Sequence, residues 1–270
     1  MMNKNLRTFF DSFKFNRNHW FSFAVDVVAV LVITFLFLGL GNILAAKAYA
    51  ISNGKTADQL KIDLLTATLE ESKDFLANVK GFAFYFFAGT IFAVLASLFI
   101  FSFSRMVIWS RVLQQKISKK RYWRWNLVVL TTGLLLIPYL LVYFLLRLIL
   151  DALIGLISNG IILVVYVQAI KALFILAFIL FAFLVSYSFV QNYKVWLSVG
   201  NAFHLLKEKW KDLWKAFLFA VVTSVVISFF LMYAQKFLFL QPIWLGVSVN
   251  LGVFLLFLTW MRLYVLRTIQ

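Results

Sequence analysis

The chain has no cysteine, only two prolines in 270 residues and few acidic side chains. Without cysteine there can be no disulfides, no thiol catalysis and no thiolate metal sites. A membrane β-barrel would need short alternating segments separated by frequent turn residues, and this chain has long apolar runs instead. Ten acidic residues stand against 26 lysines and arginines, so the formal net charge is +16.

Apolar residues make up most of the chain: 64% are hydrophobic and 13% are charged. So few charged residues could not cover so much apolar surface in a soluble helical protein. A spanning helix needs about 20 mostly apolar residues, and the runs here lack the polar stripe of a soluble surface helix. The sequence therefore predicts an all-α, polytopic transmembrane helix bundle that forms a single membrane domain, residues 1–270. Its six predicted spans are Trp20–Ala45, Gly81–Phe103, Asn126–Leu146, Ala172–Val190, Ala216–Tyr233 and Ile243–Met261.

Lysine and arginine concentrate in alternate segments of this layout: before span one, between spans two and three, between spans four and five, and after span six. The stretch 104–125 carries seven basic residues and no acid, whereas the first loop balances its cations with acids. Because short cytoplasmic loops are rich in Lys and Arg, we expect a multi-pass protein of the cell membrane with both termini in the cytoplasm. No recognition helix or stacking platform accompanies the charge, so nucleic acid is not an expected partner.

Three stretches of similar pattern precede spans one, three and five, and they predict an internal repeat with units 1–108, 109–200 and 201–270. Each unit would be an amphipathic helix followed by a helical hairpin. The alternative is that any bundle with an even number of spans looks periodic. The three apolar stripes are Leu6, Phe9, Phe10 and Phe13; Trp109, Val112, Leu113 and Ile117; and Phe203, Leu206, Trp210 and Leu213.

We expect these basic pre-span helices to lie in the headgroup plane of the bilayer and to bind anionic lipid. The alternative is that they are cytoplasmic extensions of the spans that pack against each other. Tryptophan at the membrane entry would add interface anchors. The lipid-interface candidates are Trp20, Lys116, Lys119, Lys120, Arg121, Trp125, Lys207, Lys211 and Trp214.

Polar side chains inside the spans are candidate functional groups, because burying them in a bilayer is expensive. Asp26 lies about two turns into the first span, where it could pair with Arg105 or Arg262 or form a proton or cation site. Arg147 and Asp151, four residues apart, can pair on one helix face. The candidate intramembrane polar site consists of Asp26, Gln168, Lys171, Asn192 and Asn250.

A cavity lined by Asp26, Gln168, Asn192 and Asn250 would indicate transport, and a dry bundle would indicate a scaffold. Lys171 would snorkel if the fourth span begins there, and would be buried if the helix begins near Ile161. The stretch 148–170 is either part of a helical hairpin or a re-entrant segment.

Catalytic signatures are missing from the sequence. There is no P-loop, no nucleophile elbow and no metal-binding histidine pair. Glu70, Glu71 and Asp74 fall in the stretch 56–80, which is predicted to be one solvated amphipathic helix; the alternative is a catalytic pair of carboxylates there. We therefore expect no cofactor, no metal and no enzyme activity.

The layout resembles a broad group of prokaryotic six-span membrane proteins with an amphipathic helix before each hairpin. That group includes the membrane domain attached to some glycerophosphodiester phosphodiesterases. The resemblance rests on hydropathy and the three pre-span stripes, and since no family motif is matched, no site residue transfers.

Two classes of function are compatible with the sequence. The favoured one is a non-enzymatic protein that organises the membrane or binds a partner, in contact with the bilayer and with anionic headgroups on the cytoplasmic side. A protein partner or a second copy of the chain is open as well. The alternative is a transporter or permease subunit that uses a polar intramembrane site around Asp26.

Overall fold

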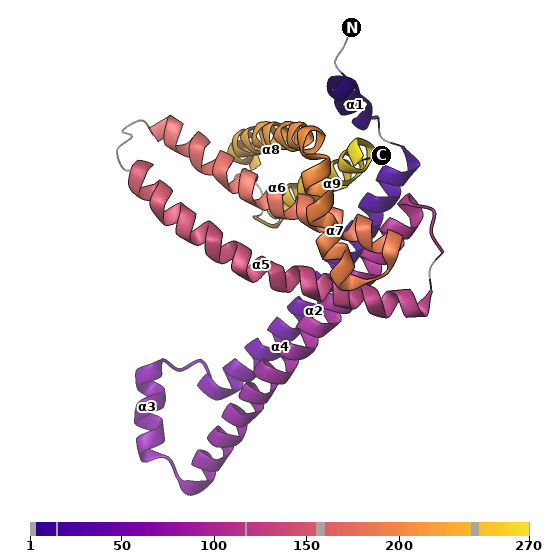
Figure 1. Cartoon of the computed structure of the whole chain (residues 1–270). Coiled ribbons are helices and arrows are strands. Elements are labelled where there is room, and N and C mark those ends of the chain that lie inside the picture. The colour runs from indigo at the N-terminus through magenta and orange to yellow at the C-terminus, as the bar shows by residue number, and fades with distance from the viewer. Residues whose placement is uncertain (1–3, 15, 117, 155–159, 239–242, 270) are drawn as a thin grey trace. The chain divides into compact units, whose positions relative to one another are not determined.

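The computed structural model describes residues 4–14, 16–116, 118–154, 160–238 and 243–269. Over these ranges the chain forms nine helices and no strand (Figure 1). The helices are α1 Lys4–Ser12, α2 Arg17–Ser52, α3 Ala57–Thr66, α4 Leu69–Val112, α5 Lys119–Ile154, α6 Gly160–Asn192, α7 Val195–Glu208, α8 Trp210–Leu238 and α9 Ile243–Ile269.

Six of these helices, α2, α4, α5, α6, α8 and α9, are long and apolar enough to cross a membrane. Each contains one predicted span, so the all-α six-span fold is confirmed. Their apolar residues surround the helix, because in a bilayer the helix satisfies its own backbone hydrogen bonds and its side chains face lipid. The stretch 148–170 is helical on both sides of residues 155–159, which lie outside the described residues.

The chain divides into two compact units. The first unit contains residues 1–27 and 102–270, and the second contains residues 28–101. The start of α2 and the end of α4 therefore belong to the first unit, while their remaining turns belong to the second. Neither the single domain nor the boundaries of the three repeats is tested by this division, and both stay predictions.

The second unit is a long helical hairpin in which α2 and α4 run side by side, with α3 in the connection between them (Figure 1). The helices approach closely at Gly89, where an added Cβ would lie 2.6 Å from the Leu40 Cδ1 atom. Nearer the connection, the Lys47 ammonium lies 5.7 Å from the centre of the Tyr85 ring. The absence of a side chain at Gly89 thus allows the close approach of Leu40.

The prediction of one helix over residues 56–80 is wrong, because the chain breaks at Ala67, whose backbone is extended. Two capping boxes explain the break. Thr56 and Gln59 cap each other at the start of α3. At the start of α4, the Glu71 N–H donates to Thr68 Oγ1 at 3.3 Å and the Thr68 N–H donates to Glu71 Oε2 at 2.8 Å. Both motifs satisfy N–H groups that a helix start leaves unpaired.

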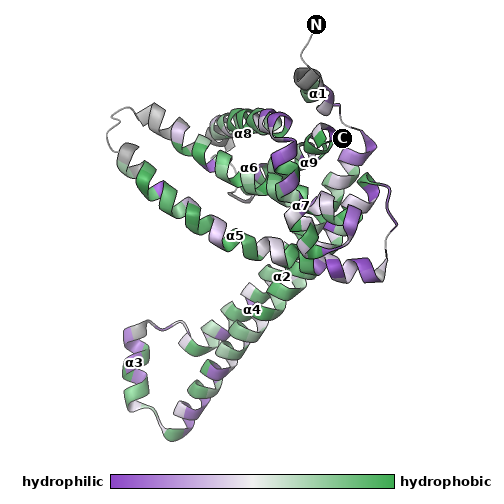
Figure 2. Ribbon diagram, in the orientation of Figure 1, coloured by the Kyte–Doolittle hydropathy of each residue, from purple (hydrophilic) through white to green (hydrophobic). Residues whose placement is uncertain are grey.

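In the first unit, α6 contacts α5, α7, α8 and α9 (Figure 1). Large buried side chains fill the space between the helices. Trp109 from α4 meets Phe183 of α6, and Trp125 from α5 meets Phe189 of α6 with ring centres 4.9 Å apart. Figure 2 shows hydrophilic residues on α7 and at the beginning of α5, while the middle of α5 and of α6 is mostly hydrophobic.

The pre-span helices before spans one and five are present, and the one before span three is not. The helix α1 packs on α8 and α9: Phe9 stacks on Phe219 at 4.8 Å, and Trp260 Nε1 donates to Ser12 Oγ at 2.8 Å. Before span five, α7 ends at Glu208 and only Lys209 separates it from α8, so the predicted stripe from Phe203 to Leu213 is divided between these two helices. The stripe predicted before span three begins at Trp109 and ends at Ile117, which lies outside the described residues. Its described members instead belong to the last part of α4 and the turn after it, with Trp109 buried among protein side chains because it packs on α6.

The six-span layout predicts which positions share a side of the membrane. We expect Gly54→Cys to be labelled by a membrane-impermeant maleimide from the side opposite to Lys209→Cys and Gln270→Cys. The chain has no cysteine of its own, so no background labelling interferes. Labelling of all three positions from one side would contradict six membrane crossings.

Candidate functional site

Three helices of the first unit each bring one charged side chain to a single buried point. Asp26 from α2 accepts a hydrogen bond on Oδ2 from Arg262 Nη2 of α9, at 2.9 Å. Its other oxygen, Oδ1, accepts from Arg105 Nη2 of α4. The prediction that Asp26 pairs with Arg105 or Arg262 is confirmed, and the carboxylate binds both. We call Asp26, Arg105 and Arg262 the ion cluster.

The ion cluster is shielded from the surface. The side chains of Arg262 and Asp26 are 0% and 2% exposed, and that of Arg105 is 13% exposed. The Arg262 guanidinium also lies over the Phe183 ring of α6, 5.5 Å from its centre, in a cation–π contact. One carboxylate and two guanidinium groups leave a net charge of +1. The ion cluster and Phe183 therefore bring four helices into contact: α2, α4, α6 and α9.

A buried hydroxyl lies about one turn from each charged residue and on the same face of its helix. These hydroxyls are Ser22 on α2, Ser102 on α4 and Thr259 on α9, each 0% exposed. Among the described residues, none of the three has a hydrogen-bond partner, and neither do Nε and Nη1 of Arg262. The surroundings of the ion cluster are thus polar, in contrast to the aromatic core beside it.

The other described members of the predicted polar site do not join Asp26. Asn250 is on α9 twelve residues before Arg262, a rise of about 18 Å along the helix. Asn192 is the last residue of α6, is exposed, and donates from Nδ2 to the Ser188 carbonyl at 3.3 Å. The Gln168 side chain lies outside the described residues.

Lys171 belongs to a different region of the bundle. Because α6 begins at Gly160, Lys171 lies eleven residues inside the helix, half-buried, and lines a small gap with Arg147 and Tyr143. Arg147 comes from α5 and Lys171 from α6, so this gap brings two cations close. The predicted partner of Arg147, Asp151, has its side chain outside the described residues.

Most of the predicted lipid-interface residues are exposed. Trp20 and Trp214 are 58% and 40% exposed. The exposed lysines of this set are Lys116, Lys120, Lys207 and Lys211, and the Lys119 side chain lies outside the described residues. Arg121 is half-buried over the Tyr193 ring, 4.1 Å from its centre.

The prediction that Trp125 anchors at the lipid interface is wrong. Trp125 is 1% exposed, because α5 turns this side chain inward against Phe189. Its neighbour Trp123 is 62% exposed and takes the outward position that the sequence analysis missed. Two tryptophans two residues apart on a helix point in different directions, and the pattern alone does not say which one meets the core.

The basic helix ends come together on one side of the first unit. The ion cluster joins α2, α4 and α9 there. Arg124 Nη1, near the start of α5, donates to the Tyr193 carbonyl after α6 at 3.0 Å. Arg267 Nη1, near the end of α9, donates to the Asp11 carbonyl of α1 at 2.6 Å. We call this region, residues 11–14, 16–26, 105–116, 118–125, 193–217 and 262–269, the basic end.

Comparison with protein-family models, with curated proteins and with solved structures finds no match for this chain. The predicted likeness to six-span proteins with pre-span helices therefore stays a prediction. Among the described residues, no group of three or more histidine, cysteine or acidic side chains is placed to hold a metal ion. What the site offers chemically is a fixed, buried arrangement of opposite charges that links helices.

Replacing Asp26 by asparagine should strongly destabilise the protein. Asp26→Asn removes the carboxylate charge that both buried guanidinium groups bind, and removing one partner of a buried ion pair costs about 3–5 kcal/mol. Thermal unfolding in detergent should show a melting temperature lower by roughly 10 °C.

The matched control is Ser22→Ala, one turn away on the same face of α2. Its hydroxyl is buried and has no partner among the described residues, so its removal should change stability little. An Asp26→Asn protein as stable as the Ser22→Ala protein would contradict a structural role for the ion cluster.

Proposed function

We propose that this chain is a non-enzymatic protein of the cell membrane that binds anionic phospholipid headgroups at its basic end, which faces the cytoplasm. The observation that carries the proposal is the gathering of exposed cations and exposed tryptophans at one end of the first unit. The exposed cations there are Lys14, Arg17, Arg111, Lys116, Lys120, Arg124, Lys194, Lys207, Lys209, Lys211 and Lys215.

The charge balance supports this orientation and this ligand. Short cytoplasmic segments of membrane proteins are rich in Lys and Arg. The cytoplasmic leaflet carries anionic lipid, and each cation near its surface contributes about 1 kcal/mol of attraction. Several exposed cations acting together would concentrate anionic lipid around the basic end.

The helix α7 supports the lipid contact. Its face with Ser198 and Ala202 is buried against the bundle. Its opposite face carries Trp196 and Phe203, which are 78% and 60% exposed, together with the exposed Lys207. Exposed aromatic rings beside a lysine are typical of a helix whose apolar side enters the interface and whose cation reaches the phosphates.

The paired state of Asp26 supports a scaffold over a transporter. A coupling carboxylate must exchange a proton or a cation with water during its cycle. Asp26 is 2% exposed and both of its oxygens accept hydrogen bonds from arginines. The described polar residues Asn192 and Asn250 lie away from it, so no specific observation favours transport.

The proposal is tested by lipid selectivity in a bilayer. The full chain is reconstituted with spin-labelled phosphatidylglycerol or phosphatidylcholine, and the fraction of motionally restricted lipid is measured. We expect a severalfold preference for phosphatidylglycerol that weakens in high salt, because salt screens surface charges. The variant Lys207→Gln/Lys209→Gln/Lys211→Gln/Lys215→Gln should lose much of this preference.

The control variant carries the same number of substitutions in the second unit: Lys47→Gln/Lys55→Gln/Lys61→Gln/Lys73→Gln. These lysines are interspersed with acids, so their removal should leave the preference nearly unchanged. Equal restriction of both lipids by the unaltered chain would contradict the proposal. Maleimide labelling of Lys209→Cys from outside intact cells would contradict the cytoplasmic placement.

A further inference from the structure

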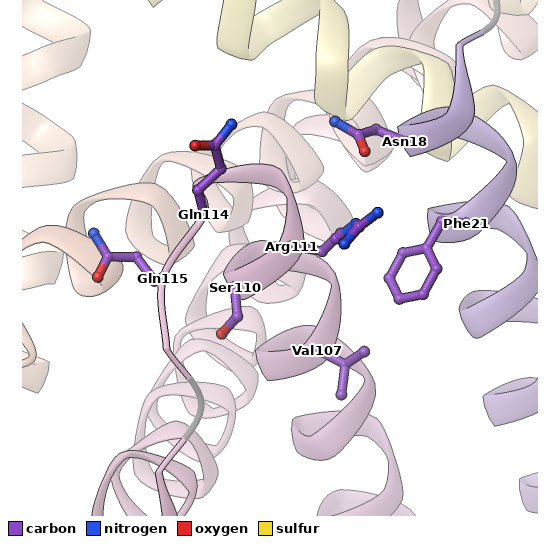
Figure 3. Close-up of a pocket in the computed structure, with 7 residues that line it drawn as sticks. All are labelled: Asn18, Phe21, Val107, Ser110, Arg111, Gln114 and Gln115. Atoms are coloured by element: carbon purple, nitrogen blue, oxygen red, sulfur yellow. The ribbon is translucent and has the colours of Figure 1, made fainter.

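A pocket of ≈ 530 Å³ lies at the basic end, between the first turns of α2 and the last turns of α4 (Figure 3). Both of these segments belong to the first unit. The volume falls in the range of about 300–1,000 Å³ that is typical of small-molecule sites. The side chains that matter here are Asn18 and Phe21 from α2, Val107, Ser110 and Arg111 from α4, and Gln114 just after α4.

The polar groups of this pocket suit an anion. Figure 3 shows Arg111 reaching from α4 toward α2, where Asn18 and Phe21 face it. The guanidinium lies 5.8 Å from the centre of the Phe21 ring, and among the described residues it makes no hydrogen bond or ion pair. No carboxylate is among the described residues that line the pocket, so its charge is +1.

Gln114 has an unusual backbone conformation. Its φ is +54°, in the left-handed region that favours glycine. The turn that requires this conformation ends α4, with the Leu113 N–H donating to the Trp109 carbonyl at 2.9 Å and the Gln115 N–H donating to the Ser110 carbonyl at 2.8 Å. Glycine would form this turn with less strain. Gln114 nevertheless occupies this position, and it lines the pocket with Arg111.

The opposite wall adds a second feature that favours anions. The helix α2 begins at Arg17, and Asn16 Oδ1 accepts hydrogen bonds from the N–H groups of Asn18 and His19 at 3.1 and 3.2 Å. The first turn of a helix carries a partial positive charge from its aligned peptide dipoles. The α2 dipole and the Arg111 charge therefore both make the electrostatic potential around the Asn18 side chain more positive.

We propose that this pocket binds the phosphate ester of one anionic phospholipid headgroup. Arg111 would pair with the phosphate, and the amides of Asn18 and Gln114 would donate hydrogen bonds to its oxygens. Two exposed apolar side chains lie near the pocket residues in the helices: Phe103, one turn before Val107 on α4, is 54% exposed, and Trp20, next to Phe21 on α2, is 58% exposed. These side chains would contact the acyl chains. The inference rests on the proposed function, since it needs the basic end to face anionic lipid.

The experiment measures one-to-one binding to the full chain in neutral detergent by native mass spectrometry. The probes are short-chain phosphatidylglycerol, short-chain phosphatidylcholine and glycerol 3-phosphate. We expect phosphatidylglycerol to bind most tightly. Arg111→Gln should weaken its binding by about tenfold or more, because a charge-assisted hydrogen bond is lost.

Two further variants separate the pocket from the general surface charge and from folding. Gln114→Gly relieves the left-handed strain, so it should keep or raise the melting temperature while weakening binding severalfold. Lys73→Gln removes an exposed cation of the second unit that does not line the pocket, so one-to-one binding should stay within about twofold. Because Gln114→Gly is expected to fold well, the test does not depend on the folding of Arg111→Gln.

Three other results would contradict the pocket site, the lipid as its ligand, or the proposed function. Equal losses for Arg111→Gln and Lys73→Gln, or unchanged binding by Gln114→Gly, would overturn the pocket site and leave the proposed function standing. Glycerol 3-phosphate binding as tightly as phosphatidylglycerol would overturn the lipid as the source of the phosphate. No preference of the unaltered chain for phosphatidylglycerol over phosphatidylcholine would contradict the site and the proposed function together.

Discussion

A buried carboxylate must be paired, protonated or hydrated, and in this protein it is paired twice. Asp26 receives one hydrogen bond from Arg105 and one from Arg262, so α2, α4 and α9 are held at one point. Phe183 beneath the Arg262 guanidinium adds α6 to the same point. Since an unpaired charge here would cost several kcal/mol, the relative positions of these helix ends are constrained more tightly than apolar contacts alone would constrain them.

That constraint fixes the helix ends from which the basic end is built. With α2, α4 and α9 joined, α1 can pack on α9 through Trp260 and Ser12, and the end of α4 can form a wall opposite the start of α2. The remaining cations then face outward, where they can attract anionic lipid without destabilising the bundle. The buried charge thus joins helices, and we propose that the exposed charge binds anionic lipid.

The sequence predicts some of this architecture and misses other parts for identifiable reasons. Run length and the all-round apolar character of the spans predict six helices correctly, because a bilayer imposes both. The pairing of Asp26 follows from the energetic cost of an isolated charge, although the sequence could not show that both arginines bind. The break before α4 carries a readable signal, the Thr68 to Glu71 capping box, which the pattern of apolar residues obscured.

Other features depend on packing and have no local signal. The stripe that begins at Trp109 looks like an interfacial helix, yet it continues α4 and faces the core, and Trp125 is buried while Trp123 is exposed. Asn250 shares α9 with Arg262, but about 18 Å of helix separates them. Asp26 on α2 therefore meets Arg262 on α9 and not Asn250 on the same helix. Which polar residues of two spans meet depends on how the helices are arranged.

The central claim is that Asp26 and Arg262 stabilise the fold through each other. A double-mutant cycle with Asp26→Asn and Arg262→Met, read as the free energy of unfolding in detergent, measures this directly. The account predicts that the double variant loses clearly less stability than the sum of the two single losses, with a coupling of about 1–3 kcal/mol. Purely additive losses would show that the two side chains act independently and would contradict the account.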